Sequence, residues 1–165
     1  MIGFRWLVGP LVALAWVVSM PAQQASAQPH DEIETRNLAT VRAGFDAWAN
    51  GTGSPYDALA DNATWEITGD SLASRLYTSK EDFLANVIRP FNARMAAPLR
   101  PAIREMYADG DTVIVLFDAE GTARDGVPYR NTYSWFLTLT GDRIVRATAF
   151  FDTITFNDLW RRVPV

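Results

Sequence analysis

The run TAFFDTITF, residues 148–156, contains a single carboxylate, Asp152, in a stretch that otherwise has the composition of a buried strand. An ionised carboxylate that leaves water costs several kcal/mol unless it is paired or hydrogen-bonded. In an unbroken strand Asp152 would share one face with Phe150 and Ile154, because side chains alternate between the two faces. If that face lines a pocket, the apolar neighbours raise the pKa of Asp152, which then becomes a general acid or base near neutral pH. Pairing with an arginine from a neighbouring strand, such as Arg130, would instead lower its pKa and give it a structural role.

Two further carboxylates, Asp118 and Glu120, continue a strand face that begins with Ile114 and Leu116. This face changes from apolar to acidic along its length, which is typical of the rim of a pocket. A solvated strand end explains the same pattern.

Four aromatic residues are candidates for the walls of a pocket, because each offers a large apolar area and one polar group. Core packing is the alternative interpretation for each of them. They are Trp65, Tyr77, Tyr133 and Trp135.

The chain contains no cysteine and one histidine, His30. The first observation excludes thiol chemistry and cysteine-ligated metals, and stability must come from packing. His30 lies in a stretch that we expect to be a solvated tail, so neither a Ser-His-Asp triad nor a histidine-rich metal site is expected. We therefore predict no metal and no cofactor.

Residues 1–27 have the three parts of an export signal. Arg5 supplies the positive charge, residues 6–20 are apolar, and Ala25-Ser26-Ala27 is a cleavage site. The apolar run is shorter than the roughly 20 residues that a bilayer requires, so no stable membrane anchor is expected. We predict a secreted or periplasmic protein with a flexible start, residues 28–36, and one domain, residues 37–165.

Cleavage would remove one of the 15 basic side chains and none of the 19 acidic ones, so the formal net charge would change from −4 to −5. A nucleic-acid partner is not expected for such a surface.

The remaining sequence predicts helices first and strands afterwards. Apolar residues at helical spacing after Asp31 predict a first helix ending at Asn50-Gly51, and a short strand follows at residues 63–68. Ser79 is placed to cap a second helix, which Pro90 should kink.

Three turn signals, Asp109-Gly110, Asp125-Gly126 and Gly141-Asp142, divide the remainder into four strands. Their expected ranges are 99–107, 112–123, 129–139 and 143–155. Helices followed by such a meander predict an α+β fold, with helices on one face of a curved sheet and a pocket in the gap that they leave.

Three segments, ATWEITG at 63–69, SKEDFLANVIRPF at 79–91 and GVPYRNTYSWFLTLTGDRIVRATAFFD at 126–152, give the chain a resemblance to the nuclear-transport-factor-2-like superfamily. The chain is most similar to its SnoaL-like group; ketosteroid isomerase and limonene epoxide hydrolase are other members. The resemblance implies a cone-shaped antiparallel sheet with helices on its concave face, a deep apolar pocket and, often, a homodimer.

In SnoaL-like cyclases an aspartate near the end of the last long strand acts as acid and base, and the resemblance places Asp152 there. It also places Asn131 and Tyr133 where relatives have polar pocket groups or a dimer surface. We therefore expect a small hydrophobic ligand. One hypothesis is acid/base catalysis by Asp152, of the isomerase, cyclase or hydrolase type, and the other is a non-catalytic binding or assembly module.

Overall fold

The computed structural model describes residues 29–165, so the predicted export signal lies outside the described residues. Six strands form one sheet in the order β2-β1-β6-β5-β4-β3. All neighbouring strands are antiparallel except β1 and β6, which run parallel. The strands are β1 (Leu59–Ile67), β2 (Leu76–Tyr77), β3 (Met95–Asp109), β4 (Thr112–Ala123), β5 (Pro128–Thr140) and β6 (Arg143–Phe151).

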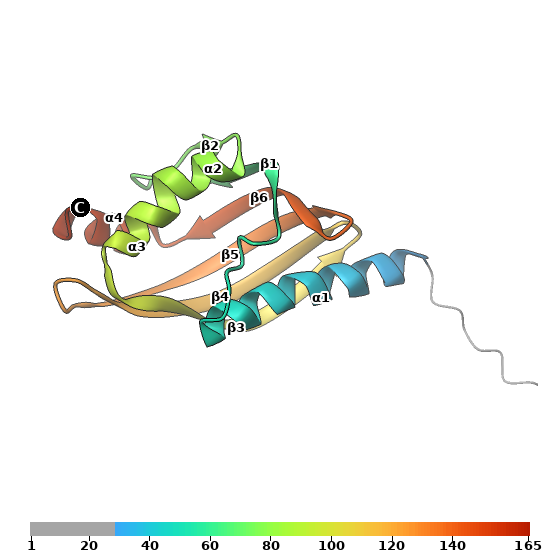
Figure 1. Ribbon diagram of the computed structural model, residues 1–165, viewed down its shortest axis with the longest axis horizontal. Coiled ribbons are helices and arrows are strands. Elements are labelled where there is room, and N and C mark those ends of the chain that lie inside the picture. Colours follow the sequence, from blue (N-terminus) through green and yellow to red (C-terminus); the bar gives the residue numbers. More distant parts are fainter. Residues whose placement is uncertain (1–28) are drawn as a thin grey trace, which may run out of the picture.

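Helices cover the concave face of this sheet (Figure 1). The first, α1 (Pro29–Asn50), is followed after β2 by a second helix made of α2 (Lys80–Phe83), a π-helical segment η1 (Leu84–Ile88) and α3 (Arg89–Ala93). Ser79 caps the second helix by accepting a hydrogen bond from the backbone N–H of Asp82. A last helix, α4 (Thr153–Arg162), follows β6. The predicted α+β class is confirmed.

The core lies between the sheet and these helices because strand residues alternate between its two faces. In β4, Val113, Val115 and Phe117 have no exposed surface, whereas the residues between them are partly exposed. From α1, Phe45 packs edge-on against Phe117 and Trp135, with ring centroids 4.9 and 5.5 Å apart. The alternation therefore gives the sheet a helix-covered inner face and an open outer face.

The three predicted turns connect the strands of the meander as expected. Gly110 and Gly141 adopt positive φ angles of 59° and 63°, which a residue with a side chain rarely adopts. The strand from Thr112 to Ala123 has the predicted bounds, and β3 begins four residues earlier than expected, at Met95.

Two predicted segments differ in the structure. Residues 29–36, predicted to be flexible, form the first turns of α1. The last strand ends at Phe151 rather than continuing to Thr155, because the Asp152 carboxylate caps α4 by accepting hydrogen bonds from the backbone N–H groups of Ile154 and Thr155. This helix, which was not predicted, buries Phe156 and Leu159 in the core. Their burial favours a helix over a continued strand in this segment.

Candidate functional site

A small apolar cavity of about 60 Å³ lies between the inner face of the sheet and the helices. Every residue that lines it is apolar or aromatic, and the polar groups of these side chains are two tyrosine hydroxyls and two tryptophan indole N–H groups. The aromatic residues of the wall are Trp48, Tyr56, Phe83, Phe91, Tyr133, Trp135, Phe151 and Phe156.

Stacked rings fix the shape of this cavity. Trp48 of α1 lies parallel to Trp135 of β5, with centroids 6.1 Å apart and planes at 5°. Trp65 of β1 stacks on Phe83 at 4.3 Å and 10°, and meets Trp135 edge-on at 5.0 Å. Such pairs each add roughly 0.5–1.5 kcal/mol beyond the burial of their area, so they stabilise the arrangement of the walls.

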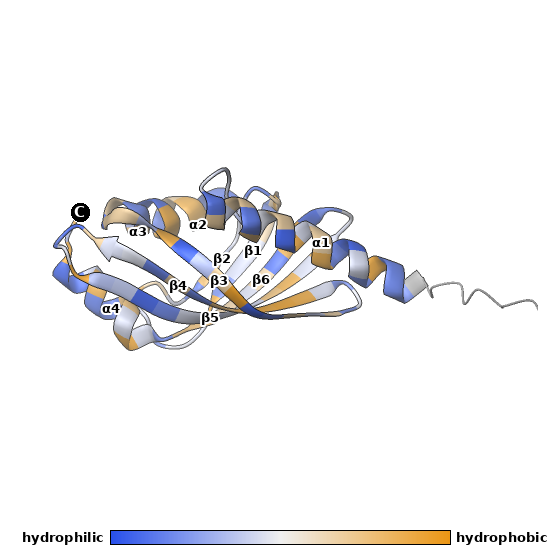
Figure 2. Ribbon diagram, turned by 90° about the horizontal axis from the view of Figure 1, so that it is seen from below, coloured by the Kyte–Doolittle hydropathy of each residue, from blue (hydrophilic) through white to orange (hydrophobic). Residues whose placement is uncertain are grey.

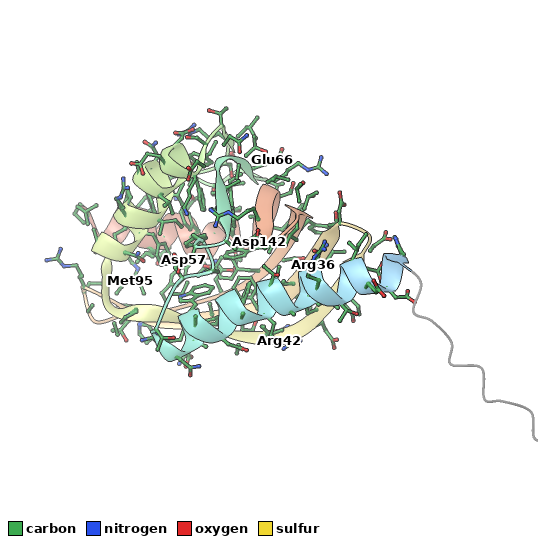
Figure 3. The ribbon with its side chains drawn as sticks, turned by 45° about the vertical axis from the view of Figure 1, so that its right-hand side comes forward. Arg36, Arg42, Asp57, Glu66, Met95 and Asp142 are labelled. Carbon is green, nitrogen blue, oxygen red and sulfur yellow. The ribbon has the colours of Figure 1, made fainter. Side chains whose placement is uncertain are left out.

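A larger, open vestibule of about 500 Å³ lies beside this cavity. The two spaces share five lining residues, Trp48, Tyr56, Ile88, Phe91 and Leu99. The segment after α1, the end of the second helix and the first residues of β3 surround the vestibule. Figure 3 labels Met95, which lines it, and Asp57, which follows Tyr56 in the chain. Its volume is in the range of sites that hold small organic molecules.

Tyr56 provides an uncommitted polar group at the boundary of cavity and vestibule. Its backbone N–H donates to the Ser54 hydroxyl, and the Ser54 N–H donates to the Asp57 carboxylate, so the segment that carries Tyr56 is held in place. Within residues 30–165 the Tyr56 hydroxyl makes no hydrogen bond. Burial raises the pKa of this phenol, which therefore stays protonated and can donate a hydrogen bond to a ligand.

A second polar group, Asn131, ties the sheet to the start of α4. Its Nδ2 donates to the Tyr129 hydroxyl and to the backbone carbonyl of Asp152, and its Oδ1 accepts from the backbone N–H of Asp152; all three distances are 3.0 Å. The hydroxyls of Tyr129 and Tyr133 lie 2.9 Å apart, and burial raises the pKa of both. The Asn131 side chain is buried and committed to protein groups, so its function in this geometry is structural.

Asp152 does not line the aromatic cavity. Its carboxylate is exposed, and hydrogen bonds from the Thr155 hydroxyl and from the backbone N–H groups of Thr155 and Ile154 lower its pKa. It faces another open depression, of about 620 Å³, which shares Arg100 with the vestibule. The depression is also lined by the predicted residues Asp118, Glu120 and Asn131. The premise of a strand that presents Asp152 to an apolar pocket is therefore corrected, because the side chain caps a helix at the rim.

The other predicted acids and Phe150 also lie on the outer face. Asp118 accepts hydrogen bonds from Arg104 and Thr132, at 2.6 and 2.7 Å, and these bonds lower its pKa. Glu120 pairs with Arg130 at 3.1 Å, so this arginine is engaged away from Asp152. The alternation of β4 that turns Phe117 and Ala119 inward turns these acids outward.

Phe150 of β6 meets Phe136 of β5 on this outer face, with centroids 5.8 Å apart, and both rings are partly exposed. In Figure 2 hydrophilic residues gather in β4 and β5 toward α4, and hydrophobic ones toward the opposite ends of these strands. The outer face carries paired charges at one end and, at the other, a groove lined by Phe136 and Phe150 together with three threonines and Arg146.

Of the four predicted aromatic residues, Tyr133 and Trp135 line the cavity. Trp65 does not line the cavity, but it packs against Phe83 and Trp135, which do. Tyr77 is buried in the core, where its hydroxyl donates to the carbonyl of Ala73 at 2.6 Å. No sequence pattern pointed to Tyr56, because it lies in a connecting segment without periodicity. Trp48 lies on the apolar face of the first helix, which the helical spacing of the sequence predicts.

His30 is placed differently from the expected solvated tail. Its Nε2 lies 2.9 Å from Glu34 Oε1, and Glu34 also accepts from the backbone N–H of Gly110 at 2.8 Å. With Asp109 these side chains place three ligand atoms within 4.8 Å of one another, a spacing that a metal ion could use. Glu34 is already engaged by two donors, so this cluster holds the start of α1 against the β3–β4 turn.

The curved sheet, its covering helices and the aromatic cavity between them define a protein of the nuclear-transport-factor-2-like fold. The sequence profile of the SnoaL-like domain matches residues 41–147, and the chain belongs to this family. No curated protein matches it. None of the helices in residues 29–165 is long and apolar enough to cross a membrane.

Solved structures share the fold at low sequence identity. An NTF2-like protein of unknown function from Burkholderia pseudomallei is 21% identical, with a TM-score of 0.62, and the match covers 79% of this chain and 98% of that one. A putative SnoaL-like polyketide cyclase from Jannaschia sp. is 18% identical with a TM-score of 0.62, covering 84% and 100%. TerC, co-crystallised with polyporic acid, is 18% identical with a TM-score of 0.61, covering 75% and 97%.

Proposed function

We propose that this protein binds a small hydrophobic molecule in the aromatic cavity and its vestibule. The observation that carries the proposal is that these two spaces share five lining residues, among them Tyr56, whose hydroxyl makes no hydrogen bond within residues 30–165. Apolar area supplies affinity in such a site, and one or two polar groups set the orientation of the ligand. TerC, which has the same fold and was co-crystallised with the small molecule polyporic acid, supports a binding role.

The binding function is favoured over acid/base catalysis by Asp152. In the described residues, no carboxylate lines the cavity or the vestibule. An exposed carboxylate with a lowered pKa is ionised at neutral pH and is a weak base. A general base must also reach its substrate within hydrogen-bonding distance, and Asp152 lines a different depression.

Fluorescence of phenylnaphthylamine, an uncharged apolar probe that brightens in apolar sites, tests the proposal. Ile88 borders both spaces, so Ile88→Trp should obstruct them and weaken binding at least about tenfold, by the volume it adds to the site. Ile154→Trp is the matched control, because Ile154 is 81% exposed on α4 and lines neither space. Asp152→Asn should bind the probe as the unchanged protein does.

Failure of the unchanged protein to bind the probe, or equal binding by the Ile88→Trp variant, would overturn the proposal. Mass spectrometry of compounds retained by the purified protein then separates the two hypotheses. Recovery of an unmodified compound from both the unchanged protein and the Asp152→Asn variant supports binding. A compound that is converted only when Asp152 is present would restore the catalytic hypothesis.

We also propose that the outer face of the sheet meets a second copy of this chain. Phe136 and Phe150 are 39% and 46% exposed there, beside a groove of about 330 Å³. The paired charges at the other end of this face, Arg104 with Asp118 and Arg130 with Glu120, give a two-fold partner complementary groups. Light scattering should give a dimer mass, and Phe150→Glu should give the monomer; a monomeric unchanged protein would reject this.

Export to a secreted or periplasmic location is proposed from residues 1–27 alone. Cleavage should leave Gln28 as the first residue. The mass of the protein purified from outside the cytoplasm would test this, since an intact Met1 would contradict it.

A further inference from the structure

The vestibule has one charged residue among those that line it in the described chain, Arg100. The other lining residues are apolar, aromatic or neutral and polar. Arg100 lies on β3 directly after Leu99, which borders both the vestibule and the cavity. A ligand whose apolar part filled the cavity would therefore have one cation at the edge of its site.

The guanidinium of Arg100 is held in position without being neutralised. Its Nη1 donates to the backbone carbonyl of Trp48 at 2.6 Å, across the mouth from β3 to the end of α1. Gly51 leaves it room: a Cβ at this position would lie 2.6 Å from Nη2, and the φ of 73° also favours glycine. The geometry of the α1 end thus accommodates this side chain.

No acid of residues 30–165 forms an ion pair with Arg100. Its cross-strand partner on β4 is Glu120, but that carboxylate pairs with Arg130 on the other side. Arg104, on the same strand, is paired with Asp118. Among the arginines of this edge, Arg100 is therefore the one whose charge is available to a ligand.

We infer that the ligand is an amphipathic organic anion, with an apolar, planar body against the cavity aromatics and an acidic group, such as a carboxylate or an ionised enol, at Arg100. This inference rests on the proposed binding function and names the class of ligand. An arginine fork matches the two oxygens of such a group and remains charged at every physiological pH. The anion also needs a local cation, because the chain as a whole carries a net charge of −4.

Two fluorescent probes that differ by one acidic group test the inference. Anilinonaphthalene sulfonate has the ring system of phenylnaphthylamine with an added sulfonate. Arg100→Gln should weaken binding of the sulfonate probe about fivefold, the value of a partly solvated ion pair, and change binding of the uncharged probe less than about twofold. Arg104→Gln makes the same change in net charge on the same strand and should leave both affinities unchanged.

Two further measurements keep the result independent of any effect of Arg100→Gln on folding. Arg100→Lys retains the charge and should recover most of the affinity for the sulfonate probe. High ionic strength should weaken binding of the sulfonate probe by the unchanged protein, while binding of the uncharged probe persists, because salt screens an exposed ion pair.

The outcomes separate this inference from the proposed function. If neither probe binds, the binding function itself fails. If the uncharged probe binds while the sulfonate probe is indifferent to Arg100→Gln and to salt, the hollow binds ligands but the inference about an anion is overturned. If Arg104→Gln and Arg100→Gln reduced the affinity for the sulfonate probe equally, the effect would come from overall charge, and the inference about an anion would also be overturned.

Discussion

The two faces of the central sheet differ in how they use the same kinds of residue. On the inner face aromatic rings stack in an apolar hollow, and the polar groups are either committed, as in Asn131, or free, as in Tyr56. On the outer face carboxylates and arginines pair in solvent, and Asp152 ends the sheet by capping a helix. The carboxylates that are candidates for acid/base chemistry therefore lie on the outer face, whereas the cavity proposed to bind a ligand lies on the inner face.

The largest predicted difference between the faces is in stability. Trp135 is 5% exposed and contacts rings from α1, β1 and β4, so Trp135→Ala should lower the free energy of unfolding by about 3–5 kcal/mol. Its neighbour Phe136 points outward, and Phe136→Ala should cost about 1 kcal/mol or less. Urea unfolding of both variants measures the contrast, and similar losses would mean that the outer ring is also buried, for instance by a partner.

Asn131 should give the next largest effect, because it joins the two faces at the β6–α4 junction. Asn131→Ala removes three hydrogen bonds, two of them to the backbone of Asp152, and should cost about 2 kcal/mol. Thr132→Ala, at the adjacent outward position, removes an exposed bond to Asp118 and should cost much less. Thermal unfolding distinguishes the two variants. A small effect of Asn131→Ala would mean that the Asp152 helix cap, and not Asn131, stabilises the β6–α4 junction.

Asp152 should contribute about 1 kcal/mol as a helix cap, the cost expected for Asp152→Ala, whereas Asp152→Asn should retain most of it. Its pKa in the folded protein lies below the ordinary value of 3.8. The stabilisation by its charge is therefore present above that value and lost as pH falls through the folded pKa. Urea unfolding at neutral and acidic pH should show the cost of Asp152→Ala shrinking in acid. A cost that grew in acid would contradict the capping geometry.

The smallest effect is expected at Tyr56. Its hydroxyl has no partner in residues 30–165, so Tyr56→Phe should change the free energy of unfolding by less than about 0.5 kcal/mol. Tyr129→Phe is the matched control, because the Tyr129 hydroxyl bonds to Asn131 and Tyr133 and its loss should cost about 1–2 kcal/mol. Equal costs for the two variants would show that Tyr56 is engaged and is not free for a ligand.

Local signals predicted much of the fold. Ser79 caps the second helix as expected, and the Asp-Gly and Gly-Asp pairs make the three turns of the meander, because caps and turns depend on a few neighbouring residues. The alternation of β4 also indicated correctly that Asp118 and Glu120 share one side. It did not indicate which side faces the helices.

The site depended on information that is not local. The sequence by itself determined the first two helices, the turns, the four-strand meander and its two-sided strands, because propensity and periodicity act over a few residues. The tertiary structure decided that Asp152 caps a helix, that Tyr56 borders the hollow and that Arg100 lies unpaired at its mouth. The cap hydrogen bonds of Asp152 are local, but the helix that they begin joins the core through Phe156 and Leu159. The positions of Tyr56 and Arg100 depend on contacts between segments distant in the chain. They also depend on the parity with which each strand enters the sheet, because a shift of one residue exchanges the inner and outer sets of side chains.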